Sequence, residues 1–213
     1  MENFSGDIKS VKLDLKACSL SIIAEEGSGL KGIAYTGPQK LEPDAVFADG
    51  EFTVTQKPVG LFGGGIMAVD KPILTVKIGK DTVLMFLDIF LKAGDVSVSG
   101  IAADLFSGVI DAGNVTISGC AFLKAEIKTK AGNTSISKSN LIQSVIEANA
   151  GNVKLDAIED LDRYDIDCKV KMGDISFAGE RSSGKNISFV KTTSNPDYIK
   201  INVNVGSVSI DMR

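Results

Sequence analysis

The segment Gly94-Asp95-Val96-Ser97-Val98-Ser99 decides the fold of this chain, because its pattern returns at a constant interval. A glycine followed by Asp or Asn and then by alternating residues begins again at Gly113, Gly132 and Gly151, and the three intervals are equal. Two looser copies follow at longer intervals, at Gly173 and Gly206. A constant period of about 20 residues is typical of a supersecondary unit stacked on copies of itself. We therefore expect a repeat architecture.

Each repeat contains two stretches in which apolar residues alternate with polar ones. The second and fourth residues after the glycine are apolar in most copies, as at Val96 and Val98. The third, fifth and seventh residues before it follow the same rule, as at Leu87, Ile89 and Leu91. Such alternation is typical of half-buried strands. We expect the two strands to meet in a sharp corner at the glycine, which adopts a positive φ at little steric cost.

The equal spacing favours an all-β, parallel β-solenoid of the β-helix type, with coils of about 19 residues. In this fold each strand pairs with the equivalent strand of the next coil, around a continuous apolar interior. An antiparallel sandwich of hairpins would also alternate, but it gives no reason for three equal intervals. The solenoid is therefore the predicted fold class.

The first third of the chain is less regular than the repeats. We expect residues 1–72 to form an irregular N-terminal β cap, with strands at 11–15, 20–22 and 50–54. Residues 73–213 form the predicted solenoid, in which an insertion at 179–196 protrudes or forms a hairpin near the far end. Cap and solenoid together are expected to make one structural domain, because hairpins at the end of a stack protect its exposed strand edge.

The composition argues against several functions. The 213 residues carry a net charge of −4 and no histidine. The chain thus lacks the basic surface typical of nucleic-acid binding and the imidazole of Ser-His-Asp and Cys-His nucleophiles. No apolar run reaches the roughly 20 residues of a membrane helix, and no signal peptide is visible in the sequence as given. We expect no catalytic residue, cofactor or metal site, no nucleic-acid partner and no membrane insertion by this chain.

The three cysteines cannot all pair with each other. Cys18 and Cys168 fall at apolar, inward positions of predicted strands. We interpret them as small core residues, not as parts of a disulfide framework.

One polar residue follows each corner glycine, and stacked coils would place these residues in a column about 4.8 Å apart. We interpret the column as a structural ladder of hydrogen bonds in the corners, which involves Gly94, Asp95, Gly113, Asn114, Gly132, Asn133, Gly151, Asn152, Gly173 and Asp174. In chain order the column then ends at Ser207. A calcium or sugar site is the alternative, but three of the polar residues are neutral amides, whereas calcium sites usually collect carboxylates.

Four large apolar residues of the first two coils are expected to point outward as one patch: Phe86, Phe90, Leu105 and Val109. Exposed patches of this size are normally covered or used for binding. The apolar, glycine-rich segment 59–67 is one candidate cover from within the chain. Self-association or a partner surface is the alternative.

The repeat of two strands and Gly-Asp/Asn-Val/Ile, after a predicted strand over 73–78, resembles a bacterial domain family of unknown function labelled "putative adhesin". The resemblance is clearest over residues 73–180, and the family is related to the head domains of some auto-transporter adhesins. It implies a place in the bacterial cell envelope or at the cell surface, whereas the sequence as given, without a visible signal peptide or anchor, leaves a cytoplasmic location open. The shared motifs are repeat motifs, so the resemblance implies architecture better than activity.

These observations favour a non-enzymatic structural or interaction module of an envelope-associated adhesin, with a protein, a cell-surface glycan or a second copy as partner. One alternative is a calcium-assisted polysaccharide lyase or another carbohydrate-active β-helix enzyme, built on Lys124, Lys128 and Lys130 beside Glu126. A groove with a lysine of lowered pKa would favour that enzyme, whereas a flat, exposed face would argue against it. A second alternative is an envelope-stress accessory protein that docks a membrane partner.

Overall fold

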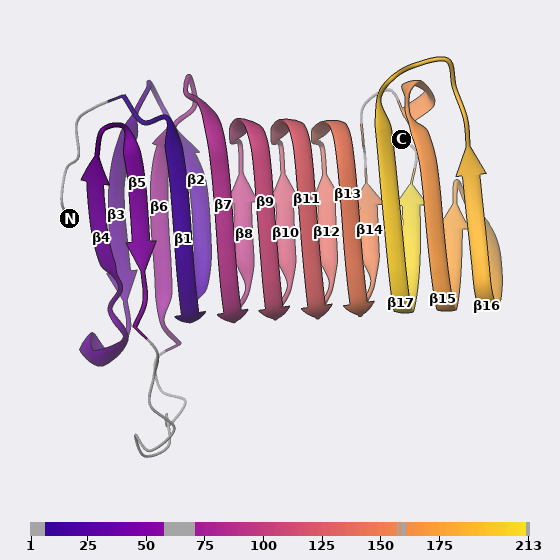
Figure 1. The fold of residues 1–213 in the computed structure, drawn as a ribbon, viewed down its shortest axis with the longest axis horizontal. Coiled ribbons are helices and arrows are strands. Elements are labelled where there is room, and N and C mark those ends of the chain that lie inside the picture. Colours follow the sequence, from indigo (N-terminus) through magenta and orange to yellow (C-terminus); the bar gives the residue numbers. More distant parts are fainter. Residues whose placement is uncertain (1–6, 58–70, 157, 159–160, 212–213) are drawn as a thin grey trace.

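The structure, a computed structural model, is a single coiled sheet of strands (Figure 1). It describes residues 7–57, 71–156, 158 and 161–211. The strands are β1 Ser10–Ala17, β2 Ser19–Glu25, β3 Leu30–Thr36, β4 Asp44–Ala48, β5 Glu51–Thr55, β6 Ile73–Gly79, β7 Val83–Ala93, β8 Val96–Ser99, β9 Ala102–Ala112, β10 Val115–Ser118, β11 Ala121–Ala131, β12 Thr134–Ser137, β13 Asn140–Ala150, β14 Val153–Asp156, β15 Asp165–Phe177, β16 Glu180–Lys191 and β17 Tyr198–Asp211. Two short 3-10 turns lie at η1 Gln39–Leu41 and η2 Leu161–Arg163.

Four regular coils form the middle of the molecule. Each has an 11-residue strand (β7, β9, β11 or β13) and a four-residue strand (β8, β10, β12 or β14). Neighbouring coils pair in parallel with a register that advances by one sequence repeat, so that Leu87 pairs with Phe106, and Phe106 with Ala125. The predicted all-β solenoid is therefore confirmed.

The N-terminal segment forms a further coil, and it lies inside the stack. β1 pairs in parallel with β7 on one side and with β5 on the other, while β2 lies between β8 and β6 in the same way. Farther out, β3 is antiparallel to β6, and β4 is antiparallel to β5 (Figure 1). The boundary at residue 72 between cap and solenoid stays a prediction, and the pairing adds that residues 10–25 themselves have the form of a coil.

The C-terminal end repeats this arrangement. β17 pairs in parallel with β13 and β14 on one side and with β15 on the other, so the last strand lies between the fourth coil and β15 (Figure 1). The expectation that the last two copies stack in chain order is therefore wrong: Gly206 lies next to Gly151, and Gly173 comes last. The physical reason is that the longer intervals before Gly173 and Gly206 supply enough chain to pass over one position and return.

The predicted insertion at 179–196 contains β16, which forms an antiparallel hairpin with β15. This hairpin covers the outer edge of β15. Both ends of the stack thus carry antiparallel strands, which interrupt the parallel pairing of the coils.

The corner glycines line up in one column, as predicted. Gly94, Gly113, Gly132 and Gly151 have φ between +138° and +145°, a region that other residues rarely adopt. A Cβ atom added at Gly113 would overlap the carbonyl oxygen of Gly94 in the preceding coil, and the same overlap recurs along the column. The backbone angle and the close stacking of successive corners therefore both require glycine.

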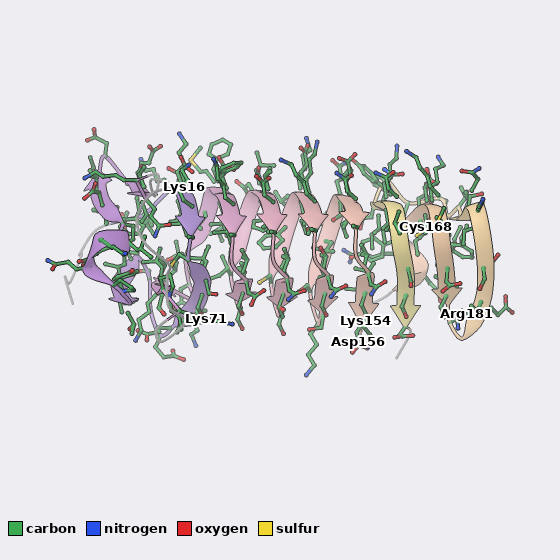
Figure 2. The ribbon with its side chains drawn as sticks, turned by 90° about the horizontal axis from the view of Figure 1, so that it is seen from below. Lys16, Lys71, Lys154, Asp156, Cys168 and Arg181 are labelled. Carbon is green, nitrogen blue, oxygen red and sulfur yellow. The ribbon has the colours of Figure 1, made fainter. Side chains whose placement is uncertain are left out.

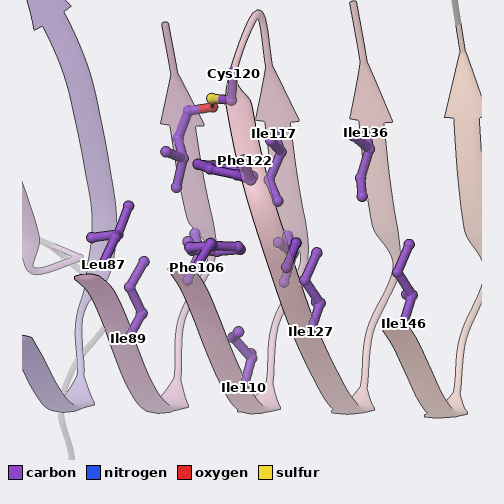
Figure 3. Close-up of a cluster of buried hydrophobic side chains, with 14 of the residues drawn as sticks. Leu87, Ile89, Phe106, Ile110, Ile117, Cys120, Phe122, Ile127, Ile136 and Ile146 are labelled. Carbon is purple, nitrogen blue, oxygen red and sulfur yellow. Dashed lines mark hydrogen bonds between the residues drawn. The ribbon is translucent and has the colours of Figure 1, made fainter. Parts of the chain in front are cut away.

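The interior is largely apolar (Figure 3), and near Phe106 and Phe122 large side chains lie beside small ones. Phe106 pairs with Ala125 of the next coil, and Phe122 pairs with Ala103 of the previous one. The two phenyl rings stack with their centroids 4.8 Å apart. This arrangement fills the interior at high density while the coils keep equal lengths.

The three cysteines are buried free thiols, so the interpretation of Cys18 and Cys168 as core residues is confirmed. Burial raises the pKa of Cys18 to about 11 and that of Cys168 to about 12. It also raises the pKa of Cys120. Protonated thiols of this kind are poor nucleophiles at neutral pH.

Candidate functional site

The stack presents two broad faces that differ in chemistry (Figure 2). We call the outward side chains of β1, β7, β9, β11 and β13 the long-strand face, and those of β2, β8, β10, β12 and β14 the short-strand face. In Figure 2, Lys16 lies on the first face, whereas Lys154 and Asp156 lie on the second. The predicted patch belongs to the long-strand face, and the predicted ladder follows a corner between the two faces.

The structure brings the four residues of the predicted patch together on the long-strand face. Phe86 pairs in register with Leu105 on the adjacent strand, and Phe90 pairs with Val109. The side chain of Phe86 is 47% exposed, and the other three are partly exposed. The segment 59–67, the predicted cover, lies outside the described residues.

Two further apolar side chains next to the patch are exposed, and simple alternation along the strand does not predict their exposure. Met85 is 51% exposed and Leu123 is 52% exposed, although each precedes another outward residue of its strand. The sequence feature that could have revealed them is the spacing of the apolar residues: the buried Leu84 and Leu87 are three positions apart, whereas strict alternation would place them two apart. A step of three leaves two consecutive side chains facing outward.

Charged side chains and a pocket border the patch on the side of β1. The Lys16 ammonium lies 5.2 Å from the centre of the Phe90 ring, and it is also paired with Asp14. Next to Phe86, a pocket of about 600 Å³ has a lining that includes Lys9, Lys12, Glu51, Met85 and Phe86. One wall of this pocket is therefore apolar and the opposite wall is charged.

The lysines of the third coil lie on the other side of the patch, and their side chains are 50–64% exposed. Each is paired with a carboxylate at 2.7–3.4 Å: Lys124 with Glu126, Lys128 with Glu147, and Lys130 with Asp111. The hydrogen bond to Glu126 raises the pKa of Lys124 and lowers the pKa of Glu126. Lyase chemistry needs the opposite shift, because a lysine must lose its proton near neutral pH to act as a base.

A ladder of hydrogen bonds runs along the corner that follows the glycine column. The Asp95 carboxylate accepts bonds from the backbone N–H of Asn114 at 2.8 Å and from its side-chain amide at 3.1 Å. The backbone bond recurs from Asn133 to Asn114 and from Asn152 to Asn133. Most of these side-chain oxygens are therefore engaged by the next coil.

Asp174 is not the next member of this ladder, because β17 lies between the fourth coil and β15. The side-chain oxygen of Asn152 accepts a bond from the backbone N–H of Ser207 at 2.9 Å. Asp174 accepts a bond from Arg181 at 2.7 Å, and hydrogen bonds from Ser183 and Arg181 lower its pKa. The column predicted in chain order is thus corrected to Asn152, Ser207 and Asp174.

Hydroxyl side chains cover the middle of the short-strand face, and no sequence motif marks them as a site. They occupy the third and fifth positions after Gly94, Gly113 and Gly132. The register places them in two rows: Ser97, Thr116 and Ser135, and Ser99, Ser118 and Ser137. Over these three coils the face is uncharged. The repeated Ser and Thr residues are visible in the sequence, but hydroxyl residues are common on exposed strands and so do not by themselves indicate a site.

The described residues contain no group of three or more His, Cys, Asp or Glu side chains that could hold a metal ion. No helix in the same part of the chain has the length and the apolar character of a membrane span.

Two solved structures share this architecture. One is described as a "putative cell adhesion protein" from Clostridium sporogenes; it superposes with a TM-score of 0.58 at 13% identity and covers 97% of this chain and 93% of that one. The other is a "putative adhesin" from Bacteroides fragilis, with a TM-score of 0.52, 12% identity, and coverage of 96% of this chain and 93% of that one. At this level of identity the two structures support the fold alone.

No protein with a curated description matches the sequence significantly. A relation to auto-transporter adhesin heads stays a prediction. The sequence pattern of one domain family, Toastrack DUF4097, matches residues 8–212, which is nearly the whole chain and every coil of the stack. The chain therefore belongs to the Toastrack DUF4097 family.

Proposed function

We propose that this chain is a non-enzymatic interaction module of the bacterial cell envelope, which binds a macromolecular surface through its long-strand face. The observation that carries the proposal is the apolar patch of Phe86, Phe90, Leu105 and Val109, which charged side chains of β1 and β11 border on both sides. Contiguous exposed apolar side chains rimmed by polar residues are typical of contact surfaces.

The architecture suits such a role. Parallel pairing from β5 through β17 to β15 holds the outward side chains in regular rows. A rigid face presents many side chains at once without the entropy cost of ordering a loop on binding. The third-coil lysines are exposed and ion-paired, which suits a contact surface better than a catalytic groove.

The similar structures support the same proposal by analogy. The proteins from Clostridium sporogenes and Bacteroides fragilis are described as a cell adhesion protein and an adhesin. Because one fold can carry many functions, the patch carries the proposal and the shared fold only agrees with it. It favours adhesion over an envelope-stress role.

The test is adhesion of beads that carry the chain. Fluorescent beads coated through a C-terminal tag are applied to isolated bacterial sacculi, to bacterial membrane vesicles and to cultured epithelial cells. We expect retention on at least one of these surfaces, loss of retention for Phe86→Asp, and unchanged retention for Thr116→Asp on the opposite face. Retention no greater than that of uncoated beads on all three surfaces would overturn the proposal.

A further inference from the structure

We infer that the long-strand face binds a second copy of this chain, in a two-fold dimer whose strands run parallel across the interface. In this dimer, β7 of one copy lies over β9 of the other. The inference rests on the proposed function only in using the same face for contact, so a second copy and an envelope surface would compete for that face. Register and charge at the central levels of that face support it.

The parallel register determines which outward side chains share a level on the face. The three central levels, read from β1 through β7 and β9 to β11, hold Ser10, Phe86, Leu105 and Lys124, then Lys12, Asp88, Ser107 and Glu126, then Asp14, Phe90, Val109 and Lys128. The two middle strands supply the patch, and the two outer strands supply most of the charge. This order is the basis of the dimer geometry.

A two-fold axis parallel to the strands, placed between β7 and β9, keeps each level opposite itself and exchanges the strands across the axis. Phe86 then lies over Leu105 of the second copy, and Phe90 lies over Val109. Both contacts occur twice by symmetry. The apolar patch is therefore buried against itself, without any other covering segment.

The same axis places β1 of one copy over β11 of the other, and their charges are complementary. Lys12 lies over Glu126, and Asp14 lies over Lys128. Each pair also occurs twice. Opposite charges in facing positions favour the matching partner and orientation.

One level farther along the strands, the pattern is mixed. Lys92 of β7 lies over Asp111 of β9, since each directly precedes the paired residues Ala93 and Ala112. The like-charged Lys16 and Lys130 also face each other. Each of these lysines is already paired within its own chain, to Asp14 and Asp111 respectively. The same holds for Lys12, Glu126 and Lys128, which are paired to Glu51, Lys124 and Glu147. The internal pairs therefore reduce the favourable and the unfavourable contacts alike.

The other two-fold arrangement of the same faces has its axis along the stack. It would place each strand over its own copy with the levels reversed. Lys12 would then lie over Lys12, Glu126 over Glu126, and Lys124 over Lys128. Like charges placed directly opposite one another are destabilising, so charge selects the parallel arrangement.

One level before Phe86 the match is poorer. Met85 and Lys9 share this level, since their backbones are joined by a 2.7 Å hydrogen bond. In the parallel dimer Met85 lies over Asp104 of the second copy, and Lys9 lies over Leu123. The pocket beside Phe86 therefore adds no complementary contact, and the arrangement depends on the three central levels.

The available area is close to what a stable dimer needs. The strands β5, β1, β7, β9, β11 and β13 lie side by side. Five residues of β5 and seven of each other strand give a footprint of roughly 630 Å² at ordinary strand dimensions. A standard interface buries about 800 Å² on each partner.

The first experiment measures mass by sedimentation equilibrium over a range of protein concentrations. We expect the wild-type chain to approach twice its monomer mass of 22.4 kDa. Phe86→Asp should raise the dimer dissociation constant roughly a hundredfold, because a central aromatic is lost at two symmetric positions. Thr116→Asp, on the short-strand face, is the matched control and should not change the constant. Unfolding in urea checks that each variant is folded.

The second experiment is a charge exchange that does not depend on the patch. Glu126→Lys should weaken the dimer about tenfold, since it places two lysines opposite each other twice. The double variant Lys12→Glu/Glu126→Lys should restore the wild-type constant. In the rejected arrangement each of these residues faces its own copy, so no rescue would occur. A dimer that is insensitive to both changes would overturn the geometry.

The outcomes separate this inference from the proposed function. A wild-type chain that stays monomeric while its beads are retained on an envelope surface would overturn the dimer and support binding to another partner. A dimer whose beads are retained on no surface would support the inference and overturn the adhesion proposal. A monomeric wild type that loses stability on Phe86→Asp would show that the patch is covered within the chain, and would overturn the dimer.

Discussion

The strands of the four middle coils and the strands at the two ends of the stack differ in how far along the sequence their pairing partners lie. In the middle, each strand pairs with the equivalent strands of the previous and the next sequence repeat, as Phe106 does with Leu87 and Ala125. At the ends, β1 and β17 pair with strands far away in sequence, and each lies between a regular coil and a covering strand. Local spacing therefore sets the middle, and long-range pairing sets the ends.

This difference has a structural consequence. Because both β1–β2 and β17 are inserted into the stack, neither of these segments is an edge strand. The strands at the two extremes, β4 at one and β16 at the other, are antiparallel to their neighbours and largely exposed. We expect substitutions at the corner glycines of the middle coils to lower the free energy of unfolding most. We also expect the inserted strands to be as tightly packed as the regular coils.

The largest effect is expected at a middle corner. Gly113→Ala should destabilise the chain by more than about 4 kcal/mol, since the added Cβ overlaps a backbone oxygen of the preceding coil. Gly119→Ala is the matched control: its φ is +63°, but nothing lies within 4 Å of the added Cβ, so about 1 kcal/mol of strain is expected. Urea unfolding measures both. Equal losses would show that the corner angle matters and the stacking of corners does not.

The next effect tests whether an inserted strand is packed like a regular coil. Ile201 in β17 and Ile127 in β11 are both fully buried, and each has parallel neighbours on both sides. Replacing either by Ala should cost about 3 kcal/mol in the free energy of unfolding, whereas Val190→Ala on the exposed β16 should change it little. A much smaller loss at Ile201 than at Ile127 would mean that the ends are looser than the middle.

The same contrast explains how much of the fold could be predicted. The constant interval from Gly94 to Gly151 was enough to predict strands, corners, parallel pairing and a column of glycines. The order of the last copies could not be derived, because the intervals before Gly173 and Gly206 differ and a longer connection has more than one end point. The pairing between β17 and β13 is a long-range contact, and no periodic feature of the sequence indicates it.

Part of the candidate site could likewise be predicted from the sequence, and part of it could not. Phe86 and Phe90 were predicted to face outward because alternation holds around them, and the register then brought them beside Leu105 and Val109. Met85 could not be placed by alternation, since one extra residue between buried neighbours moves it from the interior to the surface. Charge complementarity across the face also needs the position of β1, which only the long-range pairing supplies.

A third effect concerns the thiol of Cys168 in β15, near one end. Its pKa is raised from the ordinary 9.0 to about 12 by burial, so folding keeps it protonated in a range where the unfolded chain ionises. The corresponding stability is present below pH 9 and is lost as pH rises toward 12, with a loss of about 1.4 kcal/mol at pH 10. Urea unfolding at pH 8 and pH 10 measures it.

The comparison for that measurement is Cys168→Ala, which should lose correspondingly less stability between the two pH values. Lysines titrate alike in both proteins, so the difference reports the thiol. An identical pH dependence in the two proteins would mean that Cys168 meets water in the folded chain, and that β15 is less tightly held than the middle coils.

The smallest effect is expected in the hydrogen-bond ladder of the middle coils. Asn133→Ala removes a bond accepted from the backbone N–H of Asn152 at 2.9 Å and one donated to Asn114 at 3.2 Å. Because the site is exposed and water can replace both partners, we expect a loss of about 1 kcal/mol in urea unfolding. Asn133→Asp should lose less, since the carboxylate of Asp95 accepts the equivalent bond in the first coil. If Asn133→Ala instead cost as much as Gly113→Ala, the ladder and not the glycine column would hold successive corners in register.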